Sequence, residues 1–127
     1  MPSMSDFLES KIIDHLLRGQ AYTVPTTIYL ALCTSPTDDA GGGTEVAGGG
    51  YSRQPVTLAA SGGGGTTTST TDCVFPNMPA VTVTHGKICD AVSGGNVLMH
   101  GALVVSKVVP LGDPLTIAAG DIDLSFD

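Results

Sequence analysis

The sequence is poor in charge. Only 13% of its 127 residues are charged, about half of the usual share in a globular protein, while 42% are hydrophobic. This balance excludes an intrinsically disordered chain, which needs high charge and low hydrophobicity. A soluble monomer normally displays many more charges on its surface. The composition therefore indicates one domain whose surface is covered in part by other subunits.

Basic residues are the scarcest charges. The chain has five Lys and Arg against twelve Asp and Glu, which gives a net charge of -7, and the five are scattered. Nucleic-acid binding requires clustered Lys and Arg to neutralise phosphates, so we expect no nucleic-acid partner. No apolar run approaches the roughly 18 residues that span a membrane, so we expect no membrane association. The N-terminal sequence MPSMSDFLESK lacks the pattern of a signal peptide, and we expect synthesis in the cytoplasm.

Cysteine is also rare. Cys33, Cys73 and Cys89 are an odd number in no CxxC pattern, so they indicate neither a disulfide framework nor a zinc knuckle. Free thiols that pack as small apolar side chains are the better interpretation. Reduced thiols are also what a cytoplasmic environment favours during folding.

The sequence carries no recognisable catalytic motif and no cofactor motif. It has no GxSxG nucleophile elbow, and its single Gly-Lys pair lacks the other residues of a phosphate-binding loop. Tryptophan is absent, and three Tyr and three Phe supply little surface for stacking on sugars. We therefore expect no enzymatic activity and no cofactor.

Two sets of residues can be compared with metal sites. His85 and Cys89 lie four residues apart in one predicted strand, and His100 lies on the next, with Cys73 as a further donor. Zinc would require four ligands and a supporting shell, so ordinary core or interface residues are the better interpretation. The acidic pairs, Asp38 with Asp39 and Asp121 with Asp123, could bind calcium but lack a fixed partner set, which favours solvated side chains. We expect no metal.

The segment SDFLESKIIDHLLRGQ predicts an amphipathic helix over residues 5–18. Leu8, Ile12 and Leu16 recur at i, i+4 and i+8 and form an apolar stripe. Ser3 or Ser5 can cap its N-terminus, and a glycine at position 19 ends it. The polar face lacks the Lys and Arg of a membrane-surface helix, so we expect the stripe to pack on protein.

The rest of the chain predicts antiparallel strands separated by glycine-rich loops. Thr, Val and Ile are frequent, and the hairpin turn SGGN separates two long strands. TTIYLALCT is apolar on both faces, which indicates a central strand, whereas Pro55 excludes its own strand from a central paired position. The expected fold is a mainly β antiparallel sandwich or jelly roll of about seven strands with one N-terminal helix. Residues 1–20 would form the helix packed on the sandwich and 21–127 the sandwich, as one domain. The expected strands lie within 26–34, 51–58, 66–75, 81–91, 96–109, 115–119 and 121–127.

Nearly the whole chain resembles a family of small virion proteins of tailed bacteriophages. The family patterns S-x-x-L-E-x-x-L-L-D-H-L, A-Y-T-x-P-x-x-x-Y-x-A-L, GGGY-x-R, TH-x-x-x-x-DA-x-x-GG-N-x-L and AAGD-x-D recur here in order. Ile12 and Ile13 replace two leucines of the first pattern. The matching residues are Leu8, Glu9, Asp14, His15, Leu16, Ala21, Tyr22, Thr23, Pro25, Tyr29, Ala31, Leu32, Gly48, Gly49, Gly50, Tyr51, Arg53, Thr84, His85, Asp90, Ala91, Gly94, Gly95, Asn96, Leu98, Ala118, Ala119, Gly120 and Asp121.

This resemblance implies a structural protein of the virion. The family is often labelled tail fibre protein, but fibres reach outward through repeats or long coils, which this chain lacks. Our first hypothesis is therefore a capsid decoration or cement protein at the joints between capsomers. Its partners would be the major capsid protein and further copies of the chain.

Two alternatives stay open. One is a tail fibre, tail or baseplate component with tail proteins as partners, and the other is a host receptor- or glycan-binding module. The loops 36–50 and 61–66 are the expected contact segments. The interface candidates, from the helix stripe and from the loops, are Leu8, Ile12, Leu16, Asp38, Asp39, Tyr51 and Arg53.

Overall fold

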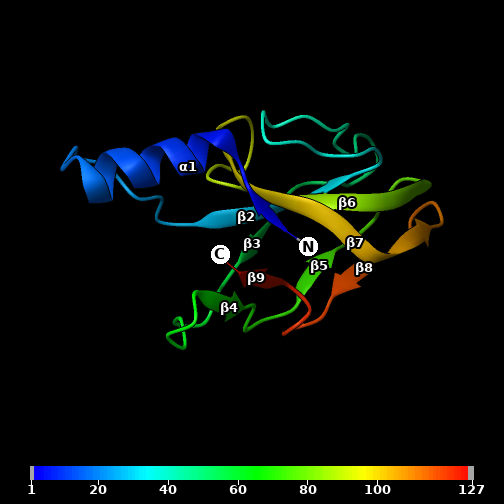
Figure 1. The fold of residues 1–127 in the computed structure, drawn as a ribbon. Helices are drawn as coiled ribbons and strands as arrows, with labels where there is room; N and C mark the ends of the chain where they lie inside the picture. Colours follow the sequence, from blue (N-terminus) through cyan, green and yellow to red (C-terminus); the bar gives the residue numbers. More distant parts are fainter. Residues whose placement is uncertain (1, 126–127) are drawn as a thin grey trace.

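The computed structural model describes residues 2–125 as a mainly β fold with one N-terminal helix (Figure 1). This confirms the predicted fold class. All strand pairs are antiparallel. The last two residues of the predicted strand 121–127, and Met1, lie outside the described residues. The elements are β1 (Ser3–Met4), α1 (Asp6–Ile12), η1 (Ile13–Leu17), β2 (Ile28–Cys33), β3 (Gln54–Val56), β4 (Thr66–Thr68), β5 (Cys73–Phe75), β6 (Val81–Cys89), β7 (Val97–Val109), β8 (Leu115–Ile117) and β9 (Asp123–Ser125).

A five-stranded sheet in the order β1-β7-β6-β2-β3 is the main layer. β2 is internal, as its two apolar faces indicate, and β3 lies at an edge, where Pro55 costs no ladder hydrogen bond on its free side. The predicted strand 66–75 is divided into β4 and β5, which pair with β9 and β8 in two small sheets. β1 is too short to show any periodicity, and the sequence did not predict it.

The core lies between the main sheet and the two small sheets (Figure 1). Leu32 and Val83 of the main sheet and Phe75 of β5 are completely buried. Leu115 of β8 and Leu124 of β9 belong to the same apolar cluster. The small sheets therefore form the second layer over one face of the large one, as in a sandwich.

The helix begins where the sequence predicts, with Ser5 as its N-cap. The Ser5 hydroxyl oxygen accepts a hydrogen bond from the backbone N–H of Leu8 at 3.2 Å, which satisfies one of the free donors of the first turn. Ser5 also fixes this end to the main sheet, because its N–H donates to the carbonyl of Leu98 at 2.9 Å and its hydroxyl donates to that of Val97. The helix continues as a five-residue π-helical segment, η1, and ends before Gly19, whose φ of 68° is typical of a terminating glycine.

Only the first half of the helix packs on the sheets. Phe7 and Leu8 contact the core cluster, and Ile12 is half-buried. Leu16, in contrast, is 69% exposed, and its neighbours Ile13 and Leu17 are exposed too. Figure 1 shows the cause, because the helix extends past the edge of the sheet. The packing predicted for the whole stripe is therefore present only at its N-terminal end.

Several glycine runs are held by the chain itself. Gly49 has a φ of 56° and lies so close to the segment Asn77–Pro79 that an added Cβ would be 3.0 Å from the backbone nitrogen of Pro79. A Cβ on Gly95 would lie 2.4 Å from a carboxylate oxygen of Asp90. Glycine is required at both places because any side chain would collide with its neighbours. The run 62–65 differs, since an added Cβ at Gly62, Gly63 or Gly64 would meet nothing within 4 Å.

Candidate functional site

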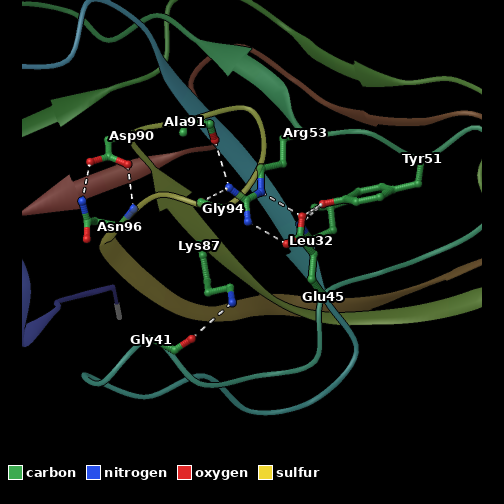
Figure 2. A network of polar contacts seen from close by, with 10 residues as sticks. All are labelled: Leu32, Gly41, Glu45, Tyr51, Arg53, Lys87, Asp90, Ala91, Gly94 and Asn96. Atoms are coloured by element: carbon green, nitrogen blue, oxygen red, sulfur yellow. Dashed lines mark hydrogen bonds and ion pairs between the residues drawn. The ribbon is translucent and has the colours of Figure 1, made fainter.

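A polar cluster joins two loops to the main sheet, and we call it the Arg53 cluster (Figure 2). Nε and Nη2 of Arg53 donate to the two carboxylate oxygens of Glu45 at 2.9 and 2.8 Å. Nη1 donates to the carbonyls of Ala91 and Gly94 at 2.9 and 2.8 Å. The Arg53 side chain is only 10% exposed. Four hydrogen bonds therefore engage Arg53 within its own chain, and they connect the loop after β6 to the loop before β3.

Tyr51 connects this cluster to the core. Its hydroxyl donates to Glu45 Oε2 at 2.8 Å and accepts from the backbone N–H of Leu32 at 3.0 Å. Its ring stacks on Phe75, with centroids 5.9 Å apart and planes within 5° of parallel. Burial of the Tyr51 ring is the main reason why the pKa of its hydroxyl is raised. A ring in this position is not available to stack on a sugar, so the cluster gives no support to glycan binding through Tyr51.

Glu45 is held as a carboxylate. Burial by itself would raise the pKa of Glu45, but hydrogen bonds from Arg53 and Tyr51 outweigh it, and the net pKa lies below the ordinary value of 4.5. The same hydrogen bonds to Glu45 are the main reason why the pKa of Arg53 is raised. The ion pair therefore persists throughout the neutral and mildly acidic range.

The lowered pKa of Glu45 predicts how the cluster responds to acid. A depressed folded-state pKa stabilises the fold fully above pH 4.5, and this stabilisation is lost as the pH falls through the folded-state pKa. We expect Glu45→Gln to be less stable than wild type at pH 7 and the gap to shrink steadily below pH 4.5. Urea unfolding of both proteins from pH 7 to pH 3 measures this gap. A gap that stays constant over that range would contradict the assigned role of Glu45.

Two further contacts fix the loops around this cluster (Figure 2). Asp90 accepts hydrogen bonds from the backbone and side-chain nitrogens of Asn96, at 2.7 and 3.0 Å, and so closes the hairpin between β6 and β7. Lys87, buried in β6, donates from Nζ to the carbonyl of Gly41 at 3.3 Å. The loop 36–50, an expected contact segment, is therefore held in place by hydrogen bonds within the chain.

A second cluster links this loop to β7. Nδ1 of His100 lies 2.9 Å from the Thr37 hydroxyl, and Nε2 lies 2.8 Å from Asp39 Oδ1. The tautomer with the proton on Nε2 donates to Asp39 and accepts from the Thr37 hydroxyl at Nδ1. This order of groups resembles a hydrolytic triad, but the His100 side chain is only 9% exposed, so a substrate has little access to the ring. The cluster instead holds the loop against β7, because His100 bonds to both Thr37 and Asp39. A hydrogen bond from the N–H of Gly42 to Asp38 at 2.7 Å orders the same loop.

The metal-ligand candidates are not gathered around one point. Within residues 2–125, no group of three or more His, Cys, Asp or Glu side chains could hold a metal ion. His85 bonds to the Thr84 hydroxyl at 2.8 Å, whereas His100 is engaged by Thr37 and Asp39. All three cysteines are free and buried, and burial raises the pKa of each thiol. Thiols in such surroundings are inert rather than nucleophilic.

An apolar hollow of about 130 Å³ lies between the main sheet and the C-terminal strands. Leu30 and Met99 line it from the main sheet, and Ile117 and Leu124 line it from β8 and β9.

Among the described residues no helix is long and apolar enough to cross a membrane.

The sequence-predicted interface residues thus fall into three places. Leu8 and Ile12 lie on the packed half of the helix and Leu16 on its exposed half. Asp38 and Asp39 lie in the loop fastened by His100, and Tyr51 and Arg53 belong to the Arg53 cluster. Contact of these seven residues with a partner stays a prediction. Sequence reasoning missed Glu45, Thr37 and the role of Lys87, because their partners lie on other elements and no local motif marks them.

These features define a compact β module whose polar clusters bind its own loops rather than an evident substrate. The sequence comparison agrees with this class. Residues 3–125 match the family described as podophage GP4 fiber I protein gp80, and the chain belongs to that family. It is therefore a structural protein of the phage virion, as the resemblance implied. Comparison with curated proteins gives no match.

Proposed function

We propose that this chain is a non-enzymatic structural component of a fibre on a short-tailed phage particle. The observation that carries the proposal is the family match, which covers residues 3–125 and is described as a fibre protein. It favours the tail-fibre alternative over capsid decoration, our first hypothesis from the sequence. The Arg53 cluster and the His100 cluster support the role of a rigid building block, because their side chains form hydrogen bonds within the chain.

The exposed end of the helix is the surface that we assign to contact with a neighbouring virion protein. Ile13, Leu16 and Leu17 project together from η1, beyond the edge of the sheet. Apolar side chains grouped in this way indicate a protein contact rather than a solvated surface. Across such an interface, a few well-packed apolar residues provide most of the binding energy.

Leu16→Asp tests this assignment. Because Leu16 is 69% exposed, we expect the variant to fold with a free energy of unfolding within about 0.5 kcal/mol of wild type. We expect particles assembled with it to carry about tenfold fewer copies of the chain, because the buried contact acquires an unpaired charge. Val92→Asp, at another exposed apolar residue, is the control and should be incorporated normally. Normal incorporation of Leu16→Asp would refute the role of the helix end.

The place on the particle is tested by stoichiometry. Purified particles are separated into heads and tails, and this chain is quantified against the major capsid protein in each fraction. A small ratio confined to the tail fraction is the expected result. A copy number comparable to that of the capsid protein in the head fraction would overturn the fibre proposal. It would favour capsid decoration, the second candidate, for which the compact, repeat-free build of the chain is the specific support.

A further inference from the structure

β7 carries an outward bulge next to a free sheet edge. Val83 pairs with Lys107 and His85 pairs with Ala102, so the four residues Leu103–Ser106 face the single residue Thr84. On its other side β7 pairs with β1 only at Met99 and His100. No hydrogen bond links the outer edge from 101 to 109 to another part of the described chain. Bulges commonly re-aim side chains at such edges.

The bulge carries valines at a sheet edge, where charged or polar side chains normally prevent pairing with another chain. Val104 is fully exposed, and Val105 is 67% exposed. We call these two residues the knuckle. A bulge that only prevented edge-to-edge pairing would be expected to display charged or polar groups. Two projecting valines instead favour association, since burying apolar side chains of this type stabilises a complex.

The knuckle forms one wall of a hollow of about 180 Å³. A cavity of about 150 Å³ is enough to hold a benzene molecule, so this hollow has room for a branched aliphatic side chain. Leu103, Ile117 and Thr116 supply its other walls, and Lys107 and Asp121 supply its charges. Neither charge has an ion-pair partner within residues 2–125.

We infer that two copies of this chain associate about a two-fold axis, with each knuckle inserted into the hollow of the other copy and Lys107 of each facing Asp121 of the other. A projection and a recess that lie side by side on one surface are self-complementary under this symmetry. The two opposite charges, unpaired within one copy, become two intermolecular ion pairs. The inference goes beyond the proposed fibre role, because the contact concerns the purified chain and holds at any place on the particle.

Charge reversal tests the identity of the occupant. In a pair of Lys107→Asp chains the new carboxylate of each chain would face Asp121 of the other, and in a pair of Asp121→Lys chains each Lys107 would face the new ammonium group. We expect either variant alone to associate roughly tenfold to hundredfold more weakly than wild type. An equimolar mixture of the two variants should associate like wild type. In the mixed pair the new carboxylate faces the new ammonium group, and the unchanged Asp121 faces the unchanged Lys107, so both contacts join opposite charges. Sedimentation equilibrium at about 100 μM chain measures this against the chain mass of 12.8 kDa.

The knuckle has a matched control on the same chain. Val105→Asp should remain monomeric, whereas Val24→Asp should pair like wild type, since Val24 is 66% exposed and lies elsewhere. Circular dichroism should show that all variants fold, because every substituted side chain is exposed or lies in the open hollow. A monomeric wild-type protein at this concentration would overturn the inference. A mixture of Lys107→Asp and Asp121→Lys that stays monomeric, or a Val105→Asp protein that pairs normally, would overturn it as well.

Discussion

Phe75→Ala is expected to lower the free energy of unfolding by about 3–5 kcal/mol, a large part of the roughly 5–15 kcal/mol that typically stabilises a domain. Phe75 is completely buried and stands on β5, in the second layer. Its ring stacks on Tyr51, whose hydroxyl is bonded to β2 of the main sheet. Removing the ring therefore leaves a cavity at the point where the two layers meet. Urea unfolding, followed by far-ultraviolet circular dichroism, measures the change.

Two companion variants make the test specific. Phe75→Leu keeps most of the apolar volume and is expected to cost about 1.5 kcal/mol. Val74→Ala, one residue earlier on the same strand, is the control, because Val74 is exposed and its truncation should cost less than about 1 kcal/mol. Similar losses for Phe75→Ala and Val74→Ala would show that β5 does not connect the layers.

The helix and the long strands could be predicted because their signals are local. The period of the apolar stripe, a capping serine and a terminal glycine all fall within residues 5–19, and the helix forms there. The strands β6 and β7 follow from long runs of β-branched residues separated by the turn SGGN. The break between β4 and β5 was not predicted, because TTTSTTDCVF is rich in β-branched residues and contains neither glycine nor proline.

What the helix packs against could not be predicted, because periodicity shows which face is apolar but not where the sheet ends. Leu8 meets the core and Leu16 lies beyond it, although the two occupy equivalent positions in the pattern. The same limit applies to the polar clusters. His100 and Asp39 are 61 positions apart, and Arg53 and Gly94 are 41 apart, so only the fold brings them together.

Composition did not predict how the glycine-rich loops are ordered. Glycine runs resist order because glycine loses the most conformational freedom on folding. Composition therefore does not indicate that these loops are ordered within one chain. Between the runs, however, stand Glu45, Tyr51 and Arg53, and these side chains provide the hydrogen bonds that order the loop within one chain. These three residues are a small part of the segment, so its overall composition does not indicate their role.

Arg53→Met should destabilise the protein by about 3 kcal/mol, because it removes the partner of a partly buried carboxylate and the donor to two loop carbonyls. Arg18→Met is the matched control. Arg18 also bonds to a carboxylate, that of Asp14 at 2.9 Å, but its side chain is 61% exposed. Its replacement should cost less than about 0.5 kcal/mol. Unfolding in urea at pH 7 compares the two variants directly.

The double variant Glu45→Gln/Arg53→Met separates the ion pair from the loop contacts. If the main cost of Arg53→Met is an unpaired Glu45 carboxylate, neutralising Glu45 removes that cost, and the double variant should be more stable than Arg53→Met alone. The loss that remains in the double variant then measures the bonds to Ala91 and Gly94, together with those lost from Glu45. A double variant whose loss equals the sum of the two single losses would mean that Arg53 and Glu45 act independently. In that case the clamp on the loop after β6, rather than the ion pair, would be the contribution of Arg53 to the fold.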